Sequence, residues 1–299
     1  MNAKIGIVPA IALIAAFSGC AGPESRVNKT SGAIIGMNTP VDYNPAKMAD
    51  LASRYKSADF TADRLQTYSD RTLTILFEAL NDGAFHLRDN AALVKMQECV
   101  LAEKIRRGKF LDHDIRDMIV GYVRQRSFDK AAALKNRFPE FKLPCVPEII
   151  PSTAPAAGLW RVYDVSDGGK KVQIKTLPLE NGPIIVMAML TGCSVGEKAM
   201  SELLADPELG PAFRKYGIII TDKFDSVGVA MWRDYFKFPE VYLTAGKKYF
   251  PGFTLDSSPY FHFIRDGKIV TRMDGWGNDG KEDFRKNLHA FLPPEAEAK

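Results

Sequence analysis

Residues 183–196 read PIIVMAMLTGCSVG, and this stretch decides which fold we expect for the second half of the chain. Its first part, Pro183–Leu190, is a continuous apolar run, which is typical of a β-strand buried on both faces. Cys193 follows shortly afterwards, and a helix-like pattern of apolar residues starts near Glu197. The pattern therefore predicts a buried strand, a short loop that carries a cysteine, and a helix that begins beside that cysteine.

The rest of this half continues the alternation of strands and helices that is typical of an α/β unit. The pair Asp266-Gly267 lies between two strand-like runs, which is a strong signal for a β-hairpin. Ser258-Pro259 comes just before that hairpin. The predicted elements are strands over Tyr216–Thr221, Tyr260–Ile264 and Ile269–Met273 and a last helix over Lys281–Phe291.

This order of elements resembles the thioredoxin superfamily: a strand, a cysteine at the start of a helix, another strand, Ser-Pro before a hairpin, and a terminal helix. The resemblance covers residues 159–295, with Trp160–Leu179 as an N-terminal β extension. It implies an α/β thioredoxin-like C-terminal domain in which Cys193 stands at the position of the family's nucleophile. It also implies that Pro259 follows a cis peptide bond and faces Cys193; such bonds are uncommon and usually a deliberate structural feature.

The segment departs from the superfamily's redox motif, Cys-x-x-Cys, at its second cysteine. Gly196 stands in place of that resolving cysteine, while Gly192 and Met187 replace the family's tryptophan and buried acid. Dithiol exchange within the motif is therefore excluded. Cys193 can still react alone, because the partial positive charge at a helix N-terminus stabilises a thiolate, and thiolates attack disulfides. An inert cysteine in a fold kept for binding stays open as the other interpretation.

The chain has four cysteines, Cys20, Cys99, Cys145 and Cys193. If Cys20 carries a lipid, an odd number remains, and at least one thiol has no partner within the chain. Cys145 lies between prolines in a segment where burial is not expected, and it is a candidate for the second thiol that Cys193 lacks. We favour a disulfide between Cys99 and Cys145 instead, because exported chains tend to pair their thiols.

Residues 1–20 have the pattern of an export signal. Lys4 provides a positive charge ahead of the apolar run Ile5–Phe17, which is too short to span a membrane. The ending Phe17-Ser18-Gly19-Cys20 resembles a bacterial lipoprotein signal. That resemblance implies that Cys20 is lipidated and becomes the mature N-terminus. Ordinary secretory cleavage and an uncleaved anchor stay open as alternatives.

The residues after the signal suggest how the protein is attached to the envelope. By the same resemblance, Ala21 favours the outer membrane, with the protein facing the periplasm. Residues 21–44 are rich in Gly, Ser, Asn, Thr and Pro and lack apolar periodicity. We therefore expect a flexible tether in this segment.

Residues 45–142 are expected to form an all-α helical-hairpin domain, because apolar residues recur there at helical spacing in four runs. Short helices joined by tight turns loosely resemble a tetratricopeptide array, a scaffold that binds partners. A plain helical bundle is the alternative that we favour, because no repeating period is found. Residues 143–158 contain four prolines and are expected to be the linker to the thioredoxin-like domain, residues 159–295.

Composition and charge argue against several functions. Lys and Arg number 40 and Asp and Glu number 36, and the net charge of +4 is spread along the chain, so nucleic-acid binding gets no support. The 4 histidines are scattered without metal-ligand spacing, and we expect neither a metal site nor a cofactor. The aromatic residues between Trp232 and Phe253 are expected to fill a core rather than to bind a partner.

The sequence thus predicts an envelope thioredoxin-like lipoprotein, a monothiol thiol–disulfide oxidoreductase that acts on protein thiols and disulfides through Cys193. The alternative is a redox-inactive binding or assembly module that docks a protein partner in the cell envelope. A peroxidase of the peroxiredoxin type has less support. Leu190-Thr191-Gly192 precede the cysteine here, whereas that family has Pro and Thr just ahead of its nucleophile.

Overall fold

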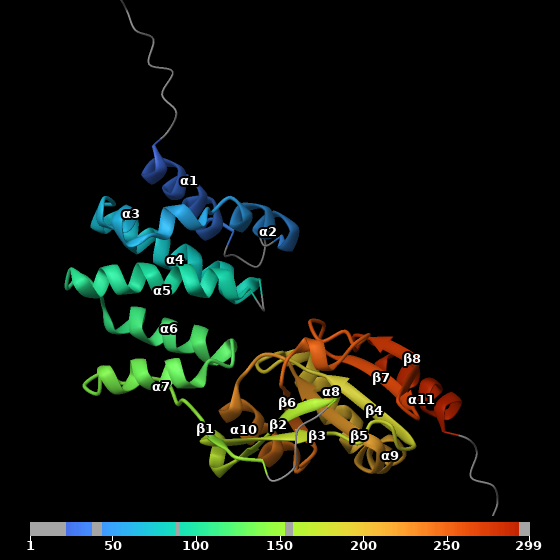
Figure 1. Cartoon of the computed structure of the whole chain (residues 1–299). Coiled ribbons are helices and arrows are strands. Elements are labelled where there is room, and N and C mark those ends of the chain that lie inside the picture. The colour runs from blue at the N-terminus through green and yellow to red at the C-terminus, as the bar shows by residue number, and fades with distance from the viewer. Residues whose placement is uncertain (1–21, 38–43, 88–89, 153–157, 293–299) are drawn as a thin grey trace, which may run out of the picture. The chain divides into compact units, whose positions relative to one another are not determined.

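A computed structural model describes residues 22–37, 44–87, 90–152 and 158–292. The chain divides into two compact units, Met1–Phe110 and Leu111–Lys299. Its N-terminal half is helical, and a mixed sheet with helices follows (Figure 1). The predicted signal segment, residues 1–20, and the predicted lipidation site Cys20 lie outside the described residues.

The described residues of the first unit form helices joined by short connections. One of the four apolar runs in residues 45–142 covers residues 73–80, and it is buried on one face of a long helix. This helix begins after Ser69, whose side chain accepts a hydrogen bond from the amide of Thr72. This helix, α4, packs against α1 and α5. The elements are α1 (Pro23–Ile35), α2 (Pro45–Ser53), a short 3-10 turn η1 (Ser57–Phe60), α3 (Ala62–Gln66), α4 (Asp70–His86) and α5 (Ala91–Arg106).

Residues 23–35 form helix α1 instead of the expected flexible tether. Pro23 stands in its first turn, where a missing N–H costs nothing. The helix buries Val27 and Ile34 almost completely. These two positions, with small polar residues between them, are too few to produce an apolar period in the sequence, and this is why the pattern did not predict a helix.

Polar contacts hold the first turn of α1 in the unit. One carboxylate oxygen of Glu24 accepts hydrogen bonds from the Ser69 amide at 2.9 Å, the Ser69 hydroxyl at 2.8 Å and the Thr72 hydroxyl at 2.6 Å. Arg26 pairs with the buried carboxylate of Asp59 at 2.5 Å. These partners are distant in sequence, so the stability of α1 depends on the fold of the whole unit.

The second unit starts with two helices, α6 (Asp112–Arg124) and α7 (Phe128–Arg137), which belong with the sheet and not, as expected, with the preceding helices. Arg126 donates hydrogen bonds to the carbonyl oxygens of Asp222 at 3.0 Å and Thr244 at 3.2 Å. The ring of Phe128 packs against Phe224 at a centroid distance of 5.0 Å. The division between the units therefore lies earlier in the chain than the predicted linker at residues 143–158.

Part of the predicted linker is a strand, β1 (Glu148–Ile150), which pairs in parallel with β3 at one edge of an eight-stranded sheet. The order across the sheet is β1-β3-β2-β6-β5-β4-β7-β8. β4 pairs in parallel with β5 and antiparallel with β7, so the sheet is mixed. The other strands are β2 (Arg161–Ser166), β3 (Lys171–Thr176), β4 (Pro183–Ala188), β5 (Gly217–Thr221), β6 (Val241–Thr244), β7 (Tyr260–Arg265) and β8 (Lys268–Asp274).

The strands and the final helix predicted for this half are confirmed by β4, β5, β7, β8 and α11. β6 was not predicted, because it lies within the aromatic-rich segment that we expected only to fill a core. The remaining elements are α8 (Ser194–Ala205), α9 (Leu209–Tyr216), α10 (Ser226–Phe236), α11 (Gly280–Phe291) and the 3-10 turns η2 (Asp167–Gly169) and η3 (Lys247–Tyr249).

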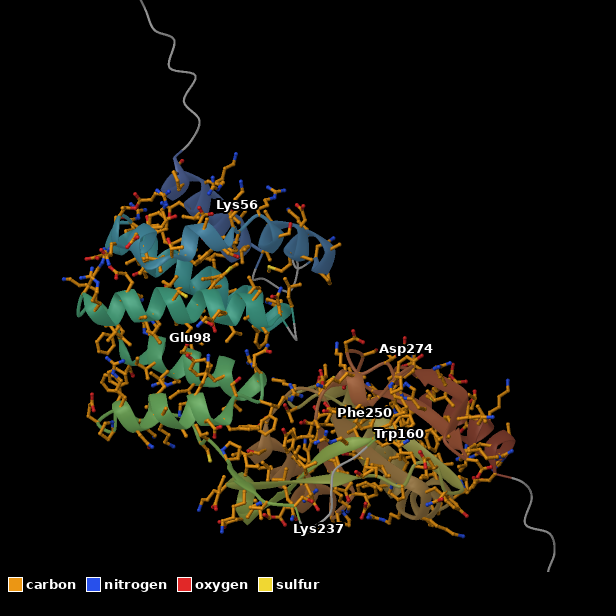
Figure 2. All side chains as sticks on the ribbon, in the orientation of Figure 1. Lys56, Glu98, Trp160, Lys237, Phe250 and Asp274 are labelled. Carbon is orange, nitrogen blue, oxygen red and sulfur yellow. The ribbon has the colours of Figure 1, made fainter. Side chains whose placement is uncertain are left out.

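Each face of the sheet carries its own core. Met187 and Phe261 point to the face where residues of α8, α9, α10 and α11 pack. On the other face, Val186 packs with Trp160 and Phe250, two rings that Figure 2 labels in the second unit and whose centroids are 5.8 Å apart. The apolar run of β4 is thus explained, because this central strand is buried on both faces.

Candidate functional site

Cys193 lies where the chain turns from the end of β4 into the start of α8, and it is the N-cap residue of that helix. Its amide donates a hydrogen bond to the Leu190 carbonyl at 3.0 Å, which closes the turn. Gly192 has a φ of +80°, a conformation that costs other residues energy because of their Cβ atom. The loop thereby places the Cys193 thiol at the helix N-terminus, where unpaired backbone N–H groups stabilise negative charge.

The segment Ser258-Pro259 faces this thiol. The peptide bond before Pro259 is cis, which confirms that prediction. The Sγ of Cys193 is 3.5 Å from the carbonyl oxygen of Ser258, and the Ser258 hydroxyl accepts a hydrogen bond from the Leu190 amide at 3.1 Å. The two predicted site residues, Cys193 and Pro259, are thus brought together by two segments far apart in the sequence.

Gly196, which stands in place of a second cysteine, is buried in the first turn of α8. A Cβ atom added there would lie 2.8 Å from Cγ of Met189 and 3.0 Å from Oγ of Ser258. Both distances are shorter than a side chain normally allows. A cysteine would therefore fit only if Met189 moved, so the packing around this position is adapted to glycine.

The site is apolar at position 187, where the resemblance to the thioredoxin superfamily implied a buried acid. Met187 is fully buried on the core face of β4, where it lies opposite Ile219 and Phe261 on the neighbouring strands. The carboxylate nearest along α8 is Glu197, in the first turn, which accepts a hydrogen bond from the indole nitrogen of Trp232 at 3.2 Å. A proton acceptor for Cys193 therefore does not come from the strand that precedes it.

Lys223 is a residue near the site that our sequence analysis missed. Its Nζ donates a hydrogen bond of 3.5 Å to the carbonyl oxygen of Thr191, two positions before Cys193. Lys223 follows β5, which is parallel to β4, so the carboxyl ends of both strands meet at one edge of the sheet. Loops that follow neighbouring parallel strands meet at the same edge of a sheet, and this rule could have predicted the contact between Lys223 and Thr191.

Helix α10 closes the loop from the same side. Asp225 caps this helix by accepting a hydrogen bond from the Gly228 amide at 2.9 Å. A Cβ atom at Gly228 would lie 2.9 Å from Cγ2 of Thr191, so the first turn of α10 packs directly on the loop that precedes Cys193. The site is therefore built by three segments, residues 189–193, 223–228 and 258–259.

The thiols of Cys99, Cys145 and Cys193 are free in the structure. Cys145 is exposed, whereas Cys99 and Cys193 are half-buried. Because Cys99 lies in the first unit and Cys145 in the second, their pairing stays a prediction.

The aromatic residues between Trp232 and Phe253 mainly fill cores, as predicted: Trp232, Phe236 and Phe250 are buried. His262 is also buried, and its Nε2 accepts a hydrogen bond from the Thr254 amide at 3.0 Å. Burial, followed by the charge of Arg272, lowers the pKa of His262 to about 4. This histidine is therefore neutral at physiological pH.

Comparison with known protein families, with curated proteins and with solved structures finds no match for this chain. Within the described ranges, none of the helices is both long enough and apolar enough to cross a membrane. In that same part of the chain, no three His, Cys, Asp or Glu side chains are grouped as a metal site requires.

Proposed function

We propose that this protein is a lipid-anchored envelope protein whose second unit is thioredoxin-like and acts on protein disulfides through the single thiol of Cys193. One observation carries the proposal. Sγ of Cys193 lies at the N-terminus of α8 and 3.5 Å from the carbonyl oxygen of Ser258, next to the cis bond before Pro259. This arrangement agrees with the resemblance to the thioredoxin superfamily and supports a role for the thiol in exchange.

The chemistry proposed for Cys193 is one step of thiol–disulfide exchange. Its thiolate attacks one sulfur of a substrate disulfide, and a new S–S bond forms between Cys193 and the substrate. The old S–S bond breaks, and the other substrate sulfur leaves as a thiolate, which takes up a proton. The product is a mixed disulfide. Gly196 cannot resolve it, so a thiol from elsewhere is needed to complete turnover.

Competition among the cysteines tests this step. The purified full chain is exposed briefly to a disulfide-containing peptide, quenched with acid and digested, and the modified cysteines are quantified by mass spectrometry. We expect Cys193 to capture the peptide faster in the folded protein than in urea, because folding places it at a helix N-terminus. Equal rates at Cys193 in folded and unfolded protein would contradict the proposal, while Cys99 serves as the reference thiol.

The envelope location is part of the same proposal and depends on Cys20. Cells that express the wild type should incorporate a labelled fatty acid into the protein, and the protein should fractionate with outer membranes. Cys20→Ser should lose the label, whereas Cys99→Ser should keep it. A label that persists in Cys20→Ser would refute lipidation at this residue.

The alternative function, a redox-inactive binding or assembly module, is favoured by one surface feature. Val227, Met231 and Tyr235 stand four residues apart on α10 and form a stripe on one side of it, with exposed fractions of 41%, 65% and 74%. Exposed apolar stripes of this kind are typical of protein–protein contacts. If an envelope partner copurifies with Cys193→Ser as well as with wild type, but not with Met231→Asp, binding rather than redox chemistry is the main function.

A further inference from the structure

The second unit contains a cavity of about 300 Å³ that the proposed function does not use. Its wall includes Cys145 and the preceding Pro144, side chains from the second half of α6, and residues 223–227. Arg124 and Lys223 bring positive charge to this wall, and the thiol of Cys145 is free and exposed. The cavity therefore presents a second accessible thiol in the same unit as Cys193.

The segment between β5 and the first turn of α10 links this cavity to the Cys193 site. Residues 223–227 line the cavity, and the same segment contacts the residues that precede Cys193. Lys223 contributes to the cavity wall while its Nζ reaches the carbonyl oxygen of Thr191 at 3.5 Å. Gly228, in the first turn of α10, packs on Thr191. Residues 223–228 thus contact both the cavity that Cys145 lines and the loop that precedes Cys193.

We propose that Cys145 is the resolving thiol of Cys193. This inference rests on the proposed function, since it needs a mixed disulfide at Cys193 to act on. Position 196, where a resolving cysteine would otherwise be expected, would accept one only if Met189 moved. Cys99 belongs to the other unit, which leaves Cys145 as the thiol that shares a folded unit with Cys193.

The resolving step balances without any further reactant. The thiolate of Cys145 attacks Sγ of Cys193, the bond between Cys193 and the substrate breaks, and the substrate sulfur leaves as a thiolate that takes up the proton lost by Cys145. A disulfide joins Cys145 and Cys193 at the end. Over the two steps, one substrate disulfide is reduced to two thiols, and the two thiols of this chain are oxidised to one disulfide.

This step requires the segment around Cys145 to move toward Thr191, because the α-carbons of a disulfide are usually about 4.4–6.8 Å apart. Between the end of α7 at Arg137 and the start of β1 at Glu148, the chain has no helix or strand. The hydrogen bond from Lys135 to the Pro144 carbonyl, 3.0 Å long, would break in such a shift. An irregular segment without strand pairing allows this movement at lower cost than a strand would.

The test compares three variants of the full chain, Cys145→Ser, Cys193→Ser and Cys99→Ser, with the wild type. Each is incubated with a disulfide-containing peptide, and the products are mapped by mass spectrometry without reduction. We expect the wild type and Cys99→Ser to yield a disulfide that joins Cys145 to Cys193. In Cys145→Ser, the mixed disulfide between Cys193 and the peptide should accumulate at least about five-fold above wild type, because the attacking thiol is gone.

Other outcomes separate this inference from the proposed function. Equal accumulation in wild type and Cys145→Ser, or a disulfide between Cys99 and Cys145, would overturn the resolving role and leave the exchange step at Cys193 intact. A chain in which Cys193 captures no peptide in any variant would overturn both. Matching circular dichroism spectra for all variants ensure that these differences do not come from misfolding.

Discussion

The loop around Cys193 and helix α1 both form hydrogen bonds with residues distant in sequence, but they differ in how much apolar burial supports them. The Cys193 loop lies between β4 and α8, whose side chains are buried in an apolar core. Helix α1 buries Val27 and Ile34, and its first turn is held through Glu24 and Arg26. The comparison teaches that apolar burial produces a pattern visible in the sequence, whereas polar contacts between distant residues do not.

The largest effect that we expect tests whether helix α7 is held in the second unit by the burial of apolar side chains. Phe128 is buried against Tyr163 and Phe224, with ring centroids 5.8 Å and 5.0 Å away. Phe128→Ala should lower the free energy of unfolding of the second unit by about 3–5 kcal/mol, because it removes a buried ring and leaves a cavity. All 3 tryptophans lie in this unit, so urea unfolding followed by tryptophan fluorescence reports it.

The control for this experiment is Val270→Ala on β8, where the side chain is exposed and a change within about 0.5 kcal/mol is expected. If Phe128→Ala were as mild as the control, α7 would not be an integral part of the second unit.

The second prediction concerns pH and the other face of the sheet. Because the pKa of His262 falls from 6.5 to about 4 on folding, the unfolded chain takes up a proton at this residue before the folded protein does. The contribution of neutral His262 to the free energy of unfolding is complete above pH 6.5 and is lost as pH falls toward about 4. At about 1.4 kcal/mol per pKa unit, the full loss is about 3 kcal/mol.

Replacing His262 by a residue that does not titrate isolates its contribution to the pH dependence of stability. His262→Gln can place its amide oxygen near the position of Nε2, as an acceptor for the Thr254 amide, but cannot titrate in this range. Urea unfolding at several pH values between 7 and 4 should show a smaller loss of stability in the variant than in the wild type. Parallel curves for the two proteins would mean that the folded structure accommodates the charged imidazole.

The parts of the fold that the sequence predicted are those with an apolar period. β4, β5, β7 and β8 appear where apolar runs or alternation indicated strands, and the Ser258–Pro259 bond is cis and faces Cys193. The division between the units was not predictable in the same way. Prolines near Cys145 indicated a boundary, but the contacts of Arg126 with Asp222 and Thr244 join segments on both sides of it.

The site was predicted only in part for a related reason. Cys193 and Pro259 stand at positions that local sequence marks, a strand end and a Ser-Pro pair. Lys223 acts through a hydrogen bond to a backbone carbonyl, and Gly196 is explained by the side chain of Met189 packed beside it. Contacts of this kind depend on the arrangement of the strands, which a single sequence does not specify.

The third prediction replaces one glycine by alanine in each region, and we expect the two substitutions to change the free energy of unfolding in opposite directions. In α8, Gly196→Ala places a Cβ atom 2.8 Å from Cγ of Met189, and we expect it to cost about 1–3 kcal/mol through overpacking. In α1, Gly32 has nothing within 4 Å of an added Cβ atom, so Gly32→Ala should stabilise the helix by about 0.5–1 kcal/mol. Thermal unfolding by circular dichroism measures both, and equal signs would contradict the comparison.

The last prediction tests the polar contacts of α1 directly. Hydrogen bonds from the Thr72 hydroxyl and from the amide and hydroxyl of Ser69 lower the pKa of Glu24 below its ordinary value of 4.5. The carboxylate therefore contributes stability above pH 4.5, and this contribution is lost as pH falls through the lowered value. Glu24→Gln keeps an acceptor oxygen but removes the charge, and since charge-assisted hydrogen bonds are the stronger ones, we expect a loss of about 1 kcal/mol at neutral pH.

Unfolding of the Glu24 variant is followed by the circular dichroism signal of the helices. The first unit contains no tryptophan, but its helices contribute to this signal. Glu78→Gln, an exposed substitution on α4 of the same unit, is the matched control and should change stability by less than about 0.5 kcal/mol. The difference between the two variants should shrink as pH is lowered below 4.5, since Glu24 in the wild type then becomes neutral as well. If Glu24→Gln matched its control at neutral pH, the charge of Glu24 would not stabilise α1, and the attachment of this helix would depend on the ion pair of Arg26 with Asp59 and on the burial of Val27 and Ile34.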